Sequence, residues 1–233
     1  MSDSISARLD QIEEKIHAAC QRSGRGRHEV GLMAVTKFQP ARAVEEAWQA
    51  GIRLFGESRV QEAAGKFNGF WGTRARDSEL HLVGSLQRNK AKTAAALFDC
   101  VQSVDRDSLI DTLGALTIER ENPLMILLEY HTGEESKAGF PSMDSLFRAA
   151  EKTLSFAKLK PAGLMTMAPF TEDKAAVRAA FRKLVAARDE LIKRFPSFGS
   201  CLSMGMTGDF EIAIEEGSTM IRIGTAIFGE RET

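Results

Sequence analysis

The chain has 233 residues and a formal net charge of −1, which gives no electrostatic basis for binding nucleic acid or an acidic membrane surface. Its three cysteines, Cys20, Cys100 and Cys201, are widely spaced and match no metal-ligand pattern, so we expect reduced thiols in a cytoplasmic protein. No apolar run approaches the ~20 residues that a membrane span needs, and the polar N-terminus is unlike a secretory signal.

Apolar residues at helical spacing predict an opening helix that starts near Ile5 and ends near Ser23-Gly24. Beyond it, short apolar runs alternate with amphipathic segments. The expected strands are Val30–Thr36, Ile52–Phe55, Leu80–Leu86, Cys100–Val104, Leu124–Tyr130, Lys160–Met167, Leu202–Met204 and Met220–Ile223. The expected helices between them are Pro40–Trp48, Val60–Phe67, Lys90–Leu97, Leu109–Arg120, Met143–Thr153, Asp173–Phe195 and Asp209–Glu216.

Eight strands, each followed by a helix or a helix-like segment, indicate that the strands pair in parallel. The chain is close to the ~250 residues typical of closed barrels of this kind. We therefore expect an α/β fold, a single (β/α)8 TIM-type barrel with an extra N-terminal helix, and one domain over residues 1–233. A doubly wound open sheet is the alternative, although no GxGxxG sequence follows the first strand.

The first expected strand is followed directly by Lys37. In parallel α/β proteins, functional groups gather at the carboxyl ends of the strands. We expect Lys37 to be buried among apolar neighbours, where loss of hydration would make its amine a better nucleophile toward an aldehyde. The alternative is a lysine that only marks the strand end and points its ammonium to water.

The last expected strand carries Arg222 between two isoleucines, and a guanidinium there is costly unless acceptors surround it. Gly224-Thr225 follows this strand, and Ser203 begins a glycine- and hydroxyl-rich turn at the seventh strand. Phosphate commonly binds after strands seven and eight of a barrel. Taken singly, Gly224 and Ser203 are better explained by turn chemistry. Together, a lysine able to form a Schiff base, an arginine and a phosphate site suggest pyridoxal 5′-phosphate as the cofactor.

Stretches over most of the chain closely resemble the pyridoxal phosphate homeostasis protein family: AVTK, FGESRVQE, HLVGSLQRNK, SVDR, GLMTMAP and LSMGMTGDFEIAIEEGSTMIRIGTAIFGER. The resemblance implies a barrel of the alanine-racemase N-terminal type that binds pyridoxal phosphate through Lys37. It also implies that Arg222 faces the pyridine nitrogen. By the same matching, the phosphate is expected to be held by Ser203, Gly224 and Thr225.

The chain departs from the family at three positions. It has Ser58 where the family usually has an asparagine near the cofactor, Ser85 where proline is usual, and Tyr130 where asparagine is usual. We expect Ser58 to contact the cofactor, less well than the asparagine would. His81 is expected to face the cofactor, with a plain strand-start histidine as the alternative. Met165 is expected to line the pocket, with plain core as the alternative.

The resemblance implies a non-catalytic protein that buffers or delivers the cofactor, with pyridoxal phosphate and the apoenzymes that depend on it as its partners. An arginine at the pyridine nitrogen would leave that nitrogen unprotonated and weaken carbanion stabilisation. Racemisation also needs an acid or base on each face of the substrate. The expected barrel uses the whole chain, and Tyr130 is its single tyrosine. We expect a monomer without catalysis.

Two enzyme functions are the alternatives to this carrier function. One is an amino-acid racemase of weak or specialised activity that uses Lys37 as one base. The other is an aldolase that acts on a phosphorylated substrate, with Lys37 as the nucleophile and no cofactor. The visible absorption of bound pyridoxal phosphate would separate the aldolase from the first two functions.

Overall fold

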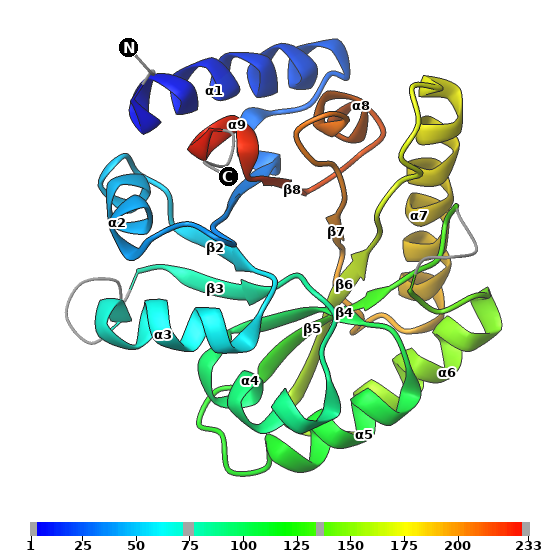
Figure 1. Cartoon of the computed structure of the whole chain (residues 1–233). Helices are drawn as coiled ribbons and strands as arrows, with labels where there is room; N and C mark the ends of the chain where they lie inside the picture. Colours follow the sequence, from blue (N-terminus) through cyan, green and yellow to red (C-terminus); the bar gives the residue numbers. More distant parts are fainter. Residues whose placement is uncertain (1–3, 72–76, 134–137, 230–233) are drawn as a thin grey trace.

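The structure, a computed structural model, describes residues 4–71, 77–133 and 138–229. Within these ranges, eight parallel strands close into a barrel in chain order, and β8 pairs back onto β1 (Figure 1). The expected (β/α)8 TIM-type barrel is therefore confirmed, and the open doubly wound sheet is excluded. The strands are β1 (Gly31–Val35), β2 (Leu54–Glu57), β3 (Glu79–Leu82), β4 (Cys100–Val104), β5 (Leu124–Glu129), β6 (Leu159–Met165), β7 (Cys201–Ser203) and β8 (Met220–Ile223).

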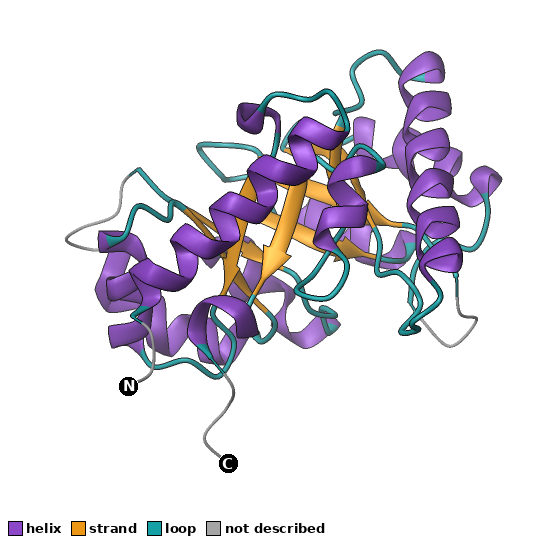
Figure 2. Cartoon of the chain, turned by 90° about the horizontal axis from the view of Figure 1, so that it is seen from above, coloured by secondary structure: helices purple, strands orange, loops and turns teal. Residues whose placement is uncertain are grey.

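Helices follow every strand and cover the outside of the barrel, as Figures 1 and 2 show from two directions. The α-helices are α1 (Ile5–Arg22), α2 (Ala41–Gln49), α3 (Val60–Trp71), α4 (Ala91–Leu97), α5 (Asp107–Leu116), α6 (Met143–Leu154), α7 (Lys174–Arg194), α8 (Phe210–Glu215) and α9 (Thr225–Phe228). Two short 3₁₀ turns, η1 (Arg27–Glu29) and η2 (Arg88–Lys90), precede β1 and α4. No helix in the described ranges has the length and apolar character to cross a membrane.

The N-terminal helix α1 lies against the last helices of the barrel, α8 and α9 (Figure 1). The hydroxyl of Ser4 caps its first turn by accepting the Ala7 amide at 3.2 Å. Arg8 ties the helix to α9 because its Nη1 donates to the Ile227 carbonyl at 3.0 Å. The prediction of an extra N-terminal helix is confirmed. Its apolar stripe is buried, namely Leu9, Ile12, Ile16, Ala19 and Cys20.

Some element ends are shifted, as in β2, which is Leu54–Glu57 instead of Ile52–Phe55, and α5, which is Asp107–Leu116 instead of Leu109–Arg120. Two further differences bear on the site and its surroundings. The third strand ends at Leu82 rather than Leu86, since the chain turns at Gly84 to pack against the residue that follows β2. A Cβ at Gly84 would lie 2.3 Å from the carbonyl oxygen of Ser58, so only glycine allows this approach. The helix α9 was not expected, because its four residues are too few to give a helical period.

Candidate functional site

A cavity of about 780 Å³ opens at the carboxyl end of the barrel. The segments after β1, β2, β3, β6, β7 and β8 line it, together with Glu129 at the end of β5 and Ala138 in the segment that follows β5. This is the end of the barrel at which active sites are built in this fold. The cavity therefore brings together residues that are far apart in the sequence.

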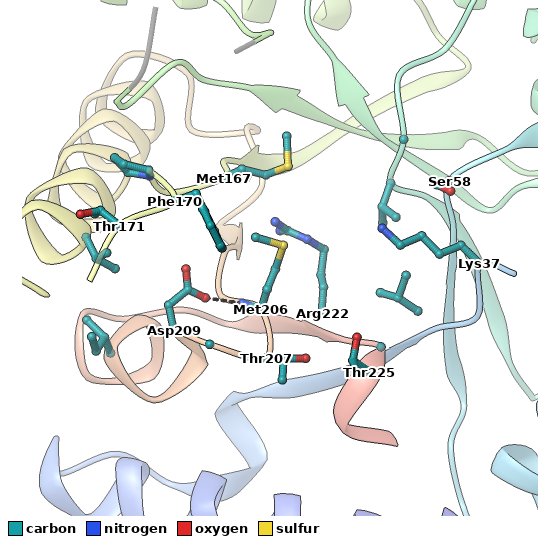
Figure 3. A pocket seen from close by; sticks show the side chains of 18 of the residues that line it. Lys37, Ser58, Met167, Phe170, Thr171, Met206, Thr207, Asp209, Arg222 and Thr225 are labelled. Carbon is teal, nitrogen blue, oxygen red and sulfur yellow. Dashed lines mark hydrogen bonds between the residues drawn. The ribbon is translucent and has the colours of Figure 1, made fainter. Parts of the chain in front are cut away.

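Lys37 and Arg222 point into this cavity from different walls, and the Thr225 hydroxyl turns toward the space between them (Figure 3). The side chain of Lys37 is exposed, so the expected burial among apolar neighbours is wrong. The reason is its position: β1 ends at Val35, and Lys37 lies beyond the buried Thr36, outside the packed strand layer. Its amine is thus accessible to a ligand in the cavity.

The backbone beside Lys37 is held in an unusual conformation. Phe38 has a φ of 63°, in the left-handed region that non-glycine residues rarely adopt. Such a conformation costs about 1–3 kcal/mol and persists only where surrounding contacts impose it. Here the Phe38 amide donates a short hydrogen bond to Oε1 of Glu62, and the guanidinium of Arg59 lies 5.0 Å from the centre of the Phe38 ring.

Arg222 is only 5% exposed and is held by oxygen acceptors of Ser203 on β7 and of Thr166, which follows β6. Its Nη1 donates to the Ser203 carbonyl at 2.7 Å and to the Ser203 hydroxyl at 2.8 Å, and its Nη2 donates to the Thr166 carbonyl at 2.9 Å. These bonds use three of the five N–H groups of a guanidinium. No described residue accepts from the other two, so Arg222 retains donors for a ligand.

Burial sets the charge properties of Arg222. It lowers the pKa of the guanidinium to about 10, while the carboxylates of Asp209 and Glu129 oppose that shift. The side chain remains a cation at neutral pH, since a pKa of about 10 is well above it. A fixed cation with free N–H groups can donate a hydrogen bond and cannot supply a proton acceptor.

A chain of hydrogen bonds runs through the barrel interior from its amino end to Arg222. Oε2 of Glu79 contacts Nε2 of His81 at 3.0 Å, and Nδ1 of His81 contacts Nε2 of Gln102 at 2.8 Å. The Ser203 hydroxyl donates to Oε1 of Gln102 at 2.6 Å and accepts from Arg222. Because an amide nitrogen only donates, the His81 ring carries its proton on Nε2. This series of hydrogen bonds orients Arg222 from the side of the barrel interior.

Glu129 is a buried carboxyl on the cavity wall. It is 4% exposed, and no described residue forms a hydrogen bond or ion pair with its side chain. Burial raises its pKa to about 7, the negative charge of Asp105 adds to the shift, and Arg222 opposes it. Glu129 can therefore hold or accept a proton near neutral pH within the same cavity as Lys37.

The turns after β7 and β8 form the remaining polar wall. Gly224 and Thr225 line the cavity after β8, and Thr207 and Gly208 line it after β7. The Met206 amide donates to Oδ1 of Asp209 at 2.6 Å and fixes the β7 turn (Figure 3). Hydroxyl and backbone N–H groups in such turns can donate to an anion.

The lining separates the predicted cofactor residues into two sets. It includes Lys37, Ser58, Arg222, Gly224 and Thr225. It does not include His81, Met165 and Ser203. His81 and Ser203 lie below the cavity in the hydrogen-bond chain, and Met165 packs against Cys100 and Leu127. A direct contact of these three residues with a cofactor stays a prediction.

Sequence reasoning missed two residues that bear on the site. Glu129 carries the same signal as Lys37, a charged residue at the end of an apolar strand, and could have been found by it. Gln102 could not, since a lone glutamine in a strand gives no sign of which side it faces. Its connection to Ser203 and His81 depends on the closure of the barrel.

The chain is similar to known proteins over nearly its whole length. The family model for the alanine racemase N-terminal domain matches residues 7–232. A pyridoxal phosphate homeostasis protein of Vibrio cholerae is 40% identical over 231 residues, which cover 98% of this chain and 97% of that protein. The solved structure of PipY from Synechococcus elongatus with PLP bound is 33% identical, with a TM-score of 0.84, and the match covers 97% of this chain and 100% of that one. Histidine racemase of Leuconostoc mesenteroides, 18% identical, shares the fold, with a TM-score of 0.73 over 97% of this chain and 57% of its own.

Proposed function

This chain belongs to the family of pyridoxal phosphate homeostasis proteins, and from that premise we propose that it binds pyridoxal 5′-phosphate as a Schiff base on Lys37 and buffers or delivers the cofactor inside the cell. The observation that carries this proposal is the pairing of an exposed lysine amine with a buried arginine that has free N–H groups, in one cavity. The barrel over residues 1–233 would form a single domain.

The residues in the cavity fit this cofactor. The amine of Lys37 is accessible for condensation with an aldehyde, and the spare N–H groups of Arg222 match an acceptor such as a ring nitrogen. Gly224 allows the turn after β8 to lie close to Val35, since a Cβ at Gly224 would be 3.3 Å from the Val35 carbonyl oxygen. When bound, pyridoxal phosphate supplies the aldehyde, which forms a C=N bond to the Lys37 nitrogen with release of one water.

The chain's own residues divide the binding between them. Lys37 supplies the nucleophilic nitrogen and must release a proton before it attacks. Arg222 would donate a hydrogen bond to the ring nitrogen and, as a cation, would leave that nitrogen unprotonated, which would disfavour carbanion chemistry. We assign the phosphate to the turn at Gly224 and Thr225. For Ser203 we propose an indirect role, because its hydroxyl already bonds to Gln102 and Arg222.

A non-catalytic role is supported by the side chains around the cavity. Racemisation needs an acid or base on each face of the substrate. Among the described residues that line the cavity, none is a tyrosine or a histidine. Tyr130 lies outside this lining, with Nζ of Lys183 at 5.1 Å from its ring centre. We therefore propose a carrier rather than an enzyme.

One observation favours the alternative, a weak or specialised amino-acid racemase. Glu129 lies on the cavity wall with a pKa of about 7, so it could act as the second base beside Lys37. The test is to incubate the protein loaded with cofactor with a panel of L-amino acids in deuterium oxide. The carrier function predicts no exchange of the α-proton and no D-isomer at enzymatic rates. Rapid exchange that is lost in both Lys37→Ala and Glu129→Gln would establish the racemase instead.

The remaining assignments concern partners and location. We propose that the protein acts as a monomer and that its partners are pyridoxal phosphate and the apoenzymes that use it. Its near-zero net charge argues against nucleic acid and membranes as partners. The three cysteines are unpaired, in keeping with a cytoplasmic location. Size-exclusion chromatography combined with light scattering would test the monomer directly.

A further inference from the structure

The segment that carries Lys37 is attached on both sides to a buried ionic cluster. This cluster, here called the α3 clamp, consists of Glu57 at the end of β2 and of Glu62 and Lys66 on α3. Nζ of Lys66 lies 2.6 Å from Oε1 of Glu57 and 3.0 Å from Oε1 of Glu62. None of the three residues appears in the cavity lining, so the clamp acts from behind the site.

Lys66 connects this cluster to the residue before Lys37. Its Nζ donates to the Thr36 carbonyl at 2.6 Å, in addition to the two carboxylates. Its side chain is 6% exposed, so the three acceptors satisfy all three donors of a buried ammonium. The Thr36 hydroxyl also donates to Oε1 of Glu57 at 2.7 Å. Thr36 is thus held by two members of the clamp, its carbonyl by Lys66 and its hydroxyl by Glu57.

Glu62 connects the same cluster to the residue after Lys37. Its Oε1 accepts the Phe38 amide as well as the Lys66 ammonium. Phe38 is the residue with a φ of 63°, a conformation that needs outside support. Phe38 is 46% exposed, so burial of its own ring does not supply that support. The contact with Glu62 supports it together with the turn bond from the Gln39 amide to the Thr36 carbonyl at 3.0 Å and the guanidinium of Arg59 at the ring.

We propose that Lys66 and Glu62 are positioning residues for Lys37. They fix the backbone before and after Lys37 and so direct its exposed side chain into the cavity. The inference rests on the proposed attachment of the cofactor to Lys37. A buried ion pair is not expected to add much stability. Its use here is geometric, since a nucleophile that is misplaced by about 1 Å can lose about a hundredfold in rate.

Glu62→Ala is the main test, because it removes the acceptor of the Phe38 amide and leaves the buried pair of Glu57 and Lys66. Lys66→Met is the second variant, and it removes the contact with Thr36. The control is Glu46→Ala, which breaks an exposed pair with Arg42 at the same i, i+4 spacing on α2. Each is compared with the unmodified full-length chain.

Three readouts separate positioning from folding. The first is the rate constant for covalent attachment of pyridoxal 5′-phosphate to Lys37, trapped with borohydride. The second is the dissociation constant of pyridoxine 5′-phosphate, which has an alcohol in place of the aldehyde and cannot form the C=N bond. The third is amide hydrogen exchange over residues 36–39 in the ligand-free protein.

We expect Glu62→Ala and Lys66→Met to slow attachment by about tenfold or more, with the affinity for pyridoxine 5′-phosphate unchanged. Exchange should rise over residues 36–39 and not across the barrel, and Glu46→Ala should match the unmodified chain. Attachment at the unmodified rate in both variants would overturn the inference. An equal loss of attachment and of pyridoxine 5′-phosphate affinity, with exchange raised throughout, would overturn it too.

Failure of the proposed function would look different from failure of the clamp. If the unmodified chain forms no adduct at Lys37, the assignment of the cofactor site is wrong. The exchange measurement then still decides the structural part of the inference. A local rise over residues 36–39 in Glu62→Ala would support the clamp, and an unchanged exchange rate there would refute it.

Discussion

The two walls of the cavity hold their principal residues in opposite ways. On the β1 wall, the backbone around Lys37 is fixed by the α3 clamp, while the side chain itself is exposed. On the β8 wall, the guanidinium of Arg222 is itself fixed, by oxygen acceptors of Ser203 on β7 and of Thr166, which follows β6. The difference matches the chemistry asked of each residue. A nucleophile must move to form and release a bond, whereas a hydrogen-bond donor works best when it is already in place.

The largest effect predicted for the β8 wall concerns phosphate. Pyridoxal should bind far more weakly than pyridoxal 5′-phosphate, because several charge-assisted hydrogen bonds of about 1.5–3 kcal/mol each are lost, which amounts to orders of magnitude in affinity. A spectroscopic titration with both compounds measures the difference. Thr225→Val, which removes one hydroxyl at constant shape, should weaken the binding of the phosphorylated compound only. Equal affinities of the unmodified chain for the two compounds would contradict the assignment of a phosphate site to this wall.

The second prediction concerns Glu129, which lies on the wall formed by β5. Its pKa rises from 4.5 to about 7 on folding, so between these values the folded protein binds a proton that the unfolded chain has released. The free energy of unfolding should therefore fall as the pH rises through this window, by a total on the order of 3 kcal/mol. The glutamine in Glu129→Gln cannot ionise, so this decrease in the free energy of unfolding should be absent from the variant. At about pH 8 the variant should therefore be more stable than the unmodified chain.

Urea unfolding at about pH 5 and about pH 8 measures this dependence, since each carboxyl with a raised pKa contributes to the slope. The matched control is Glu172→Gln, which changes an exposed carboxylate that lines the same cavity. It should keep the pH dependence of the unmodified chain. A Glu129→Gln variant whose stability declines with pH as steeply as that of the unmodified chain would show that Glu129 does not carry the proton.

The smallest predicted effect comes from the hydrogen-bond chain beneath Arg222. Gln102→Leu removes the acceptor of the Ser203 hydroxyl but leaves the Ser203 and Thr166 carbonyls to hold Arg222. The affinity for pyridoxine 5′-phosphate should fall by about fivefold, corresponding to roughly 1 kcal/mol for one neutral hydrogen bond. The rate of attachment at Lys37 should not change. A slower attachment with unchanged affinity would mean that the two walls are not independent.

The order of the barrel could be read from the sequence because each apolar run is followed by an amphipathic one, as β5 and α6 illustrate. Lys37 and the turn at Gly224 could be found because each follows an apolar strand, and Arg222 because it is a charged residue between two isoleucines of one. The exposure of Lys37 could not be predicted, since it depends on the residue at which β1 ends. The α3 clamp could not be predicted either, because a turn, a helix and a strand separate Thr36 from Lys66 in the sequence and only the fold brings the two residues together.

We propose Lys37 as the residue to which the cofactor attaches. The direct measurement is to load the protein with pyridoxal 5′-phosphate, reduce it with borohydride and map the modified peptide by mass spectrometry. Borohydride supplies the hydride that converts the C=N bond into a stable amine. Lys174→Ala, which changes another lysine of the cavity lining, serves as the control. We expect a single adduct on Lys37, kept in Lys174→Ala and absent from Lys37→Ala. An adduct on Lys90, Lys137 or Lys174 instead, or no adduct at all, would contradict it.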